Sequence, residues 1–176
     1  MKRTILSIAM FLMIVSSKNS SAQNSGDVAL KLPGLVTALS SESEMNTREI
    51  SVTAVNVRAK RDFDRSYKKI PDVKWFNSEN GSFASFVSDG THTKVVYDTK
   101  GRRAYAIVSY IEAKLDRDVR ALVKSTYYDA TIIGIHQFEF DHKTVYVIKM
   151  LDQQSTPLTL QVCDGQMEDI TTHAKK

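Results

Sequence analysis

The stretch GSFASFVSDGTHTKVVYDTKGRRAYAIVSYI, residues 81–111, decides how this chain folds. It contains three runs rich in β-branched and aromatic residues, separated by Asp89-Gly90 and by a second short turn that ends at Gly101. The runs are 82–88, 91–97 and 102–111. Asp-Gly between such runs is a strong signal for a tight hairpin. Links this short make consecutive strands antiparallel, because a parallel crossover needs about a dozen residues or more.

An amphipathic helix is predicted before these strands. Val55, Ala59, Phe63 and Tyr67 recur every four residues with charged residues between them, and Pro71 ends the pattern. A further strand-like run, 73–76, joins the helix to the stretch quoted above. The first half of the body therefore reads as a helix followed by four strands.

The same order of elements follows a second time. Val119, Leu122, Val123 and Tyr127 fall on one face of a second helix. Four strand-like runs follow it, at 130–140, 144–151, 158–163 and 166–171. We therefore predict an α+β fold, a tandem repeat of a helix plus four antiparallel strands. The repeats span about 52–111 and 115–171, with the helices packed on one face of a curved antiparallel sheet.

The first 22 residues have the order of a secretory signal peptide. Lys2 and Arg3 precede an 11-residue apolar run, and small residues lead to a cleavage site near Ala22. A membrane-spanning helix needs about 20 apolar residues, so an uncleaved anchor is the less favoured alternative. We expect a periplasmic or secreted protein without a membrane span in its mature chain. Removal of 1–22 also takes away three basic residues and reduces the formal net charge from +4 to +1.

Residues 23–49 form a polar leader that we expect to be flexible, and 172–176 form a polar tail. Leu30, Leu32 and Leu35 interrupt the polarity of the leader, so a strand or a turn of helix laid on the body is the alternative. The strands of the body carry apolar residues on both faces. Either the leader, the tail or sheet curvature buries the surplus, or one face stays partly open as a binding surface.

No motif in the sequence indicates catalysis, a metal or a cofactor. The four histidines lack metal-ligand spacing, and the single cysteine, Cys163, lies in an apolar run typical of a buried residue. The basic residues between Arg58 and Lys69 enclose acidic ones, so we interpret them as a solvated helix face and expect no nucleic-acid partner. The sequence thus predicts a protein that is not an enzyme and holds neither metal nor cofactor.

Several short phrases, taken in order, resemble the PepSY-like family of exported bacterial proteins, which is similar in fold to the β-lactamase-inhibitor protein. In the first half they are Tyr67-Lys68-Lys69-Ile70-Pro71, Val73-Lys74-Trp75, Gly81-Ser82-Phe83-Ala84-Ser85-Phe86 and Tyr97-Asp98-Thr99-Lys100-Gly101. In the second half they are Asp118-Val119-Arg120, Val123-Lys124-Ser125-Thr126-Tyr127-Tyr128 and Asp141-His142-Lys143-Thr144-Val145-Tyr146. The second helix departs from the pattern, because Asp129 follows Tyr127-Tyr128 without the expected proline. The resemblance covers residues 50–171.

The resemblance implies export to the envelope of a bacterium with an outer membrane, of the Bacteroidetes type, and no defined activity. Relatives by fold bind or inhibit other proteins. We therefore expect a non-catalytic module that binds an unknown protein or peptide of the envelope and modulates an enzyme or sensor. A small apolar-ligand or lipid-binding protein is the alternative. Candidate partner-binding residues are the aromatic Trp75, Phe86 and Tyr146, although Trp75 is also a natural core residue.

Overall fold

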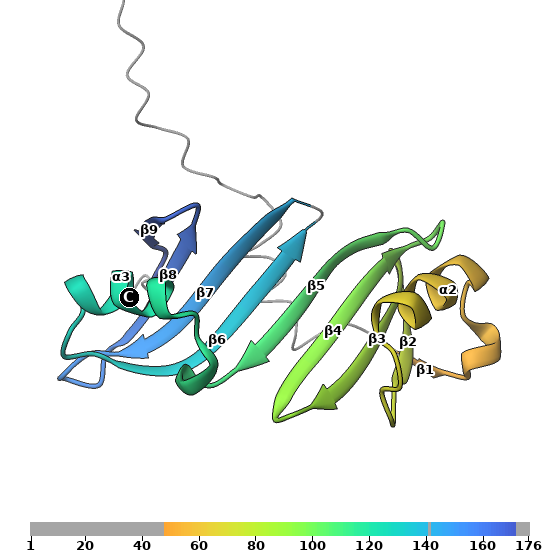
Figure 1. Cartoon of the computed structure of the whole chain (residues 1–176), viewed down its shortest axis with the longest axis horizontal. Helices are drawn as coiled ribbons and strands as arrows, with labels where there is room; N and C mark the ends of the chain where they lie inside the picture. Colours follow the sequence, from red (N-terminus) through yellow and green to blue (C-terminus); the bar gives the residue numbers. More distant parts are fainter. Residues whose placement is uncertain (1–47, 141, 172–176) are drawn as a thin grey trace, which may run out of the picture. The chain divides into compact units, whose positions relative to one another are not determined.

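The computed structural model describes residues 48–171 except residue 141. Within these residues nine strands form one antiparallel sheet in sequence order, and Figure 1 shows them side by side. The strands are β1 (Arg48–Ile50), β2 (Lys74–Ser78), β3 (Gly81–Ser88), β4 (Thr91–Asp98), β5 (Arg103–Tyr110), β6 (Thr131–Phe140), β7 (Lys143–Leu151), β8 (Pro157–Cys163) and β9 (Gln166–Asp169). The helices are α2 (Val57–Ser66) and α3 (Arg117–Thr126), each preceded by a 3₁₀ turn, η2 (Val52–Ala54) and η3 (Glu112–Lys114).

The predicted tandem repeat of a helix plus four strands is wrong. The described chain is mostly one nine-stranded antiparallel sheet with only two short helices of ten residues each. Strand β1 lies at the border of the predicted leader, for which a strand was the less favoured alternative. Strand β5 pairs with β6 across the border of the predicted units, with Ile107 opposite Phe138. Local periodicity reports which elements form, whereas the pairing of β5 with β6 bridges about thirty residues of sequence and leaves no local pattern. The predicted signal peptide, most of the predicted leader and the tail lie outside the described residues.

Each helix begins at a side-chain cap. The carboxamide Oδ1 of Asn56 accepts a hydrogen bond from the backbone N–H of Arg58 (2.9 Å), and this bond caps α2. Asp116 caps α3 by accepting from the backbone N–H groups of Asp118 and Val119. The carboxylate of Asp116 also suits the positive end of the helix dipole. The first helix starts later than its apolar pattern suggested, because the turn at 52–54 precedes the cap.

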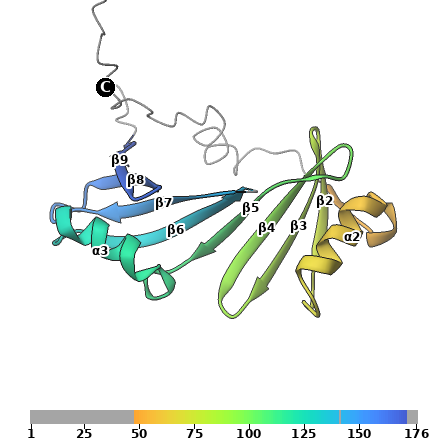
Figure 2. The ribbon, with the colours of Figure 1, turned by 45° about the horizontal axis from the view of Figure 1, so that its top comes forward.

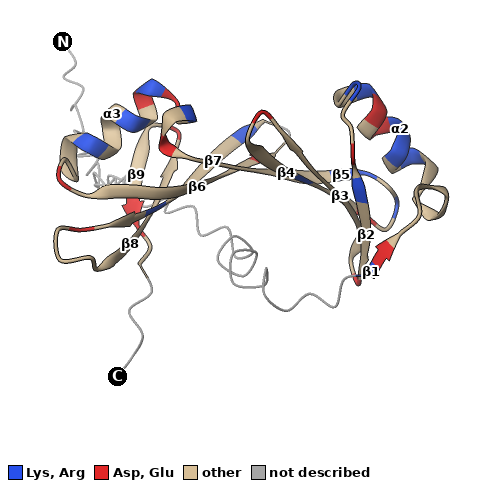
Figure 3. Ribbon diagram, turned by 90° about the horizontal axis from the view of Figure 1, so that it is seen from below, with Lys and Arg blue, Asp and Glu red and all other residues tan. Residues whose placement is uncertain are grey.

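Both helices pack on the same face of the sheet (Figure 3). Under α2, Phe63 contacts a cluster that contains Trp75, Phe86 and Tyr97. Under α3, Val123 belongs to a second cluster, whose strand residues include Ile135, Ile148 and Leu160. The register shows that these two clusters share one face, since Ala106 of the first lies four residues from Tyr110 on β5, and Tyr110 pairs with Ile135. Figure 2 shows β5 and β6 adjacent between the two helices.

Candidate binding groove beside helix α2

A β-bulge places Arg103 next to α2. Val96 of β4 pairs with Tyr105, but Tyr97 pairs with Arg103, so Ala104 is an extra residue in β5. Strict alternation would put Arg103 on the opposite face from Ala106, and the extra residue reverses this. Arg103 therefore joins Tyr97 on the face that the helices cover.

Two tyrosine hydroxyls lie in the contact between β4–β5 and α2, and one of them bonds Arg103. Arg103 Nη2 donates a hydrogen bond to Tyr67 Oη at 3.0 Å, and its guanidinium carbon lies 5.6 Å from the centre of the Tyr67 ring. Tyr97 Oη donates to a carboxylate oxygen of Asp62 on α2 at 3.2 Å. Arg103 Nη2 also lies 3.6 Å from the carboxylate oxygen Oε2 of Glu139 on β6. The Arg103 side chain is thus held by two partners, Tyr67 and Glu139.

The polar contacts continue from β5 across β6. Gln137 Nε2 donates to Glu139 Oε1 at 3.0 Å, and Tyr110 Oη donates to Gln137 Oε1 at 2.5 Å. These residues lie on β5 and β6, on the sheet face that the helices cover, and Tyr110 also packs against the cluster beneath α3. A network in which each member has a partner fixes side-chain positions, so the orientation of Glu139 towards Arg103 is defined from both sides.

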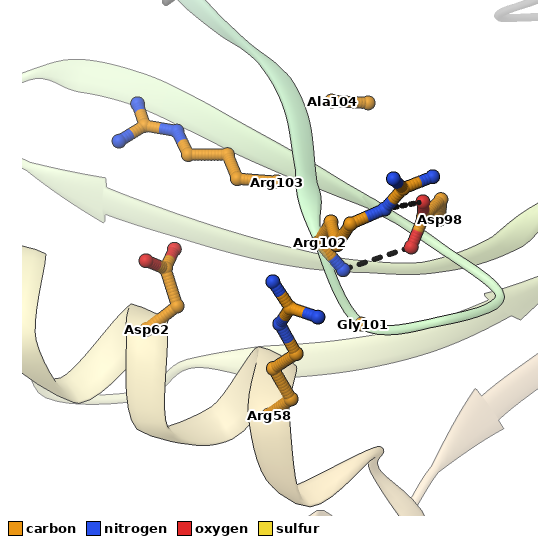
Figure 4. A pocket seen from close by; sticks show the side chains of 7 residues that line it. All are labelled: Arg58, Asp62, Asp98, Gly101, Arg102, Arg103 and Ala104. Atoms are coloured by element: carbon orange, nitrogen blue, oxygen red, sulfur yellow. Dashed lines mark hydrogen bonds and ion pairs between the residues drawn. The ribbon is translucent and has the colours of Figure 1, made fainter.

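A hollow of about 560 Å³ opens beside this network, and Figure 4 shows the side chains that line it. Arg58 and Asp62 come from α2, while Asp98, Gly101, Arg102 and Arg103 come from the β4–β5 turn and the start of β5. A second hollow of about 240 Å³ shares Arg103 with the first and is bounded by Glu139 and Phe140. We call the two hollows together the Arg103 groove.

The acidic groups of the Arg103 groove are already engaged. Asp98 accepts hydrogen bonds from the backbone N–H groups of Arg102 and Lys100 and forms an ion pair with the Arg102 side chain at 2.7 Å. These contacts, with the Arg102 backbone N–H foremost, hold the pKa of Asp98 below its ordinary value. Asp62 accepts from Tyr97. Among the described residues no ion pair is found for Arg58, so its guanidinium is available to an incoming anion.

The tyrosine hydroxyls of the network are uncharged. Burial, followed by the negative charge of Asp62, raises the pKa of Tyr97 far above the ordinary phenol value. Burial also raises the pKa of Tyr67, and the positive charge of Arg103 opposes that shift. Both hydroxyls therefore keep their protons at neutral pH. The groove can bind a carboxylate or phosphate through guanidinium groups.

The three predicted partner-binding residues do not form one surface site. Trp75 and Phe86 are only 2% and 5% exposed and pack around Phe63 beneath α2. Tyr146 is half-buried and lies in the separate cluster beneath α3. A role for these three residues in binding stays a prediction. The sequence reading missed Arg103, because the bulge that reorients it has no local signature, and it treated Arg58 as one member of a solvated helix face.

The part of the chain that the structure describes offers few side-chain groups for metal binding or hydrolysis. It holds no cluster of three or more potential metal ligands among His, Cys, Asp and Glu, and no helix long and apolar enough to cross a membrane. Two serine–histidine hydrogen bonds are present, Ser85 to His92 at 2.8 Å and Ser109 to His136 at 2.9 Å. Such a bond is one element of a hydrolytic site and by itself shows no catalytic activity.

Comparison with known proteins identifies a shared fold. No protein-family model and no curated protein matches the chain, so the PepSY-like part of the resemblance is not confirmed. A BLIP-like protein from Bacteroides fragilis is 15% identical with a TM-score of 0.56, over 69% of this chain and 91% of that one. A DUF2874 family protein from Bacteroides ovatus is 16% identical with a TM-score of 0.56, over 66% and 89%.

A third solved structure has been provisionally assigned to the periplasm. It comes from Bacteroides eggerthii, is 11% identical with a TM-score of 0.54, and the match covers 66% of this chain and 90% of that one. At such identities the likeness shows that the fold is BLIP-like, and the fold alone carries no activity from one protein to another.

Proposed function

We propose that this chain is an exported, non-catalytic binding module of the bacterial cell envelope. It binds an envelope protein or peptide, and the Arg103 groove receives an acidic side chain or a terminal carboxylate of that partner. The BLIP-like fold, the neighbour assigned provisionally to the periplasm and the predicted signal peptide support this proposal. Modulation of an envelope enzyme or sensor is the purpose that such binding would serve.

One observation carries the proposal. Tyr67 and Glu139 hold Arg103 in one orientation at the groove, while Arg58 lies on the facing helix without an ion pair among the described residues. A side chain held by its neighbours loses less conformational entropy on binding than a free one. Two guanidinium groups arranged in this way favour a planar, negatively charged oxygen ligand.

The alternative from the sequence, an apolar-ligand or lipid carrier, has less support. A carrier needs a cavity lined mainly by apolar side chains. The larger hollow is lined largely by charged residues, and the smaller one has the charged Arg103 and Glu139 beside Ala104, Tyr105 and Phe140. Native mass spectrometry of protein purified from its own envelope would detect a bound lipid, and a stoichiometric lipid would favour the alternative.

Charge-reversal variants test the groove directly. Parent protein and Arg58→Glu are compared for binding to an array of acidic and amidated peptides. Arg61→Glu serves as the matched control, because Arg61 is exposed on the same helix and does not line either hollow. We expect Arg58→Glu to abolish binding to acidic peptides and Arg61→Glu to retain it. Equal binding by all three proteins would refute the groove as the binding site.

Arg103→Lys adds a second arm to the test. Lysine keeps the positive charge but loses the fork of donors that bonds Tyr67 and a ligand together. We expect weaker peptide binding with little change in thermal unfolding. The sequence-based candidates are tested alongside, through Tyr146→Ala, because truncation of Trp75 or Phe86 would remove core packing and confuse binding with stability.

A further inference from the structure

Strands β5 and β6 separate at one end of their ladder. The register between them ends at Ala106 opposite Glu139, whereas β5 already begins at Arg103. Over residues 103–105, β5 stays paired with β4, and Phe140 at the end of β6 stays paired with β7. Each strand is therefore held on its outer side only, and Figure 1 shows the two strands diverging there.

The smaller hollow of the Arg103 groove lies where these strands separate. Its lining residues are the first three of β5 and the last two of β6. Arg103 and Glu139 lie on the face that the helices cover, whereas Tyr105, which pairs with Val96, lies on the other face. A volume of about 240 Å³ equals that of about eight water molecules, so the hollow suits the end of an extended chain and is too small for a helix.

The backbone of β5 borders the smaller hollow as a strand edge. In a sheet the N–H and C=O groups of a strand are directed towards its neighbours on both sides. Among the described residues, the register gives 103–105 no partner on the β6 side. An unpaired strand edge is a template for an added extended chain. A peptide placed in the hollow would therefore continue the ladder along β5 through its main chain.

Arg103 places a positive charge on the wall that the two hollows share. Its contacts with Tyr67 and Glu139 both use Nη2, so within the described part of the chain the donors of Nη1 and Nε are left for a ligand. Arg58 adds a second guanidinium across the larger hollow. A carboxylate that reaches this wall can therefore form charge-assisted hydrogen bonds.

An aromatic pair forms the apolar side of the smaller hollow. The ring centroids of Tyr105 and Phe140 are 5.9 Å apart, and both side chains are half-buried. Such a pair favours contact with an apolar side chain. The hollow thus offers a strand edge, a guanidinium and an apolar wall within the space of one residue. The last residue of a peptide carries main-chain groups, a carboxylate and a side chain that match all three.

We propose that the Arg103 groove binds the free C-terminus of an extended peptide whose last residue is apolar. The terminal carboxylate binds Arg103, the last side chain lies against Tyr105 and Phe140, and the main chain follows the unpaired edge of β5. This inference rests on the proposed function and narrows it, because it selects a chain end over an internal acidic side chain. The partner is then a protein with an accessible, apolar C-terminus.

Four peptides of one length separate a chain end from an acidic side chain. Gly-Ser-Gly-Ser-Gly-Leu is used with a free carboxylate, as its C-terminal amide, and as an amide with glutamate in place of the second serine. The fourth peptide ends in glycine with a free carboxylate. NMR titrations of the isotope-labelled full chain follow the backbone amides of Ala104, Tyr105 and Phe140. We expect the free-carboxylate leucine peptide to bind at least about tenfold more tightly than either amide, because amidation removes the charge that Arg103 recognises.

Phe140→Ala tests the aromatic wall, and Trp75 fluorescence verifies that the variant is folded. It should bind the leucine-ended peptide about three- to tenfold more weakly than the parent does, and the glycine-ended peptide equally well. Tyr128→Ala is the matched control, because Tyr128 is 77% exposed and lines neither hollow. It should bind both peptides as the parent does.

The outcomes distinguish this inference from the proposed function. Tightest binding by the glutamate amide at these amides would overturn the inference and leave the groove as a site for acidic side chains. Equal binding of the leucine peptide and its amide, or unchanged binding of the leucine peptide by Phe140→Ala, would also overturn the inference. No binding by any of the four peptides would overturn both the inference and the proposed function.

Discussion

Gly101→Ala probes the contact between the β4–β5 turn and the start of α2. Gly101 has φ +72°, and a Cβ added there would lie 2.5 Å from Asn56 Oδ1 and 3.0 Å from the backbone nitrogen of Ala59. The same Oδ1 atom caps α2 through the N–H of Arg58. The substitution therefore forces alanine into a left-handed conformation and also displaces the helix cap.

The two effects have separate magnitudes. A left-handed conformation costs a non-glycine residue about 1–2 kcal/mol, and loss of an N-cap costs about 1 kcal/mol. We expect Gly101→Ala to lower the free energy of unfolding by about 2–3 kcal/mol. Gly90→Ala is the matched control, because Gly90 has φ +68° and nothing within 4 Å of an added Cβ. Gly90→Ala should show only the conformational cost.

Urea unfolding followed by Trp75 fluorescence measures both variants. The excess cost at Gly101 should largely disappear in an Asn56→Ala background, where the cap is already lost and the clashing oxygen is absent. Equal destabilisation by Gly90→Ala and Gly101→Ala would refute the reasoning. So would an excess at Gly101 that is unchanged by Asn56→Ala.

Three further predictions concern the core, the thiol and the turn. Trp75→Ala empties the centre of the cluster beneath α2 and should lower the free energy of unfolding by about 3–5 kcal/mol in urea titrations. Burial raises the pKa of the Cys163 thiol while Lys143 opposes the shift, so Lys143→Gln should slow iodoacetamide alkylation further at neutral pH; faster alkylation would contradict this. The pKa of Asp98 is lowered, chiefly by the Arg102 backbone N–H, so its contribution to stability is present above about pH 4 and is lost as the pH falls through the lowered value. The stability advantage of the parent over Asp98→Asn should shrink accordingly in acid, and a constant difference would contradict the reasoning.

The elements of this fold follow closely from local chemistry. Asp89-Gly90 adopts positive φ at both residues and connects β3 to β4, as the sequence predicts. The four-residue spacing from Val55 to Phe63 places Ala59 and Phe63 on the buried side of α2. Turn residues and helix periodicity act within a few residues, so sequence alone reports them reliably.

The Arg103 groove could not be predicted in the same way. Alternation along 103–110 puts Arg103 on the face away from α2, and only the unequal pairing of Val96 and Tyr97 with β5 reverses it. The partners of Arg103 are 36 residues distant at Tyr67 and 36 residues distant at Glu139. No local pattern relates side chains so far apart.

The sequence by itself determined the hairpin turns, the two amphipathic helices and the order of the strands, because each depends on interactions between near neighbours. The pairing of β5 with β6 and the orientation of Arg103 were decided only by the tertiary structure. These features arise from strand pairing and from long-range contacts between side chains. The free energy of such contacts depends on residues that are distant in sequence and meet only in the folded chain.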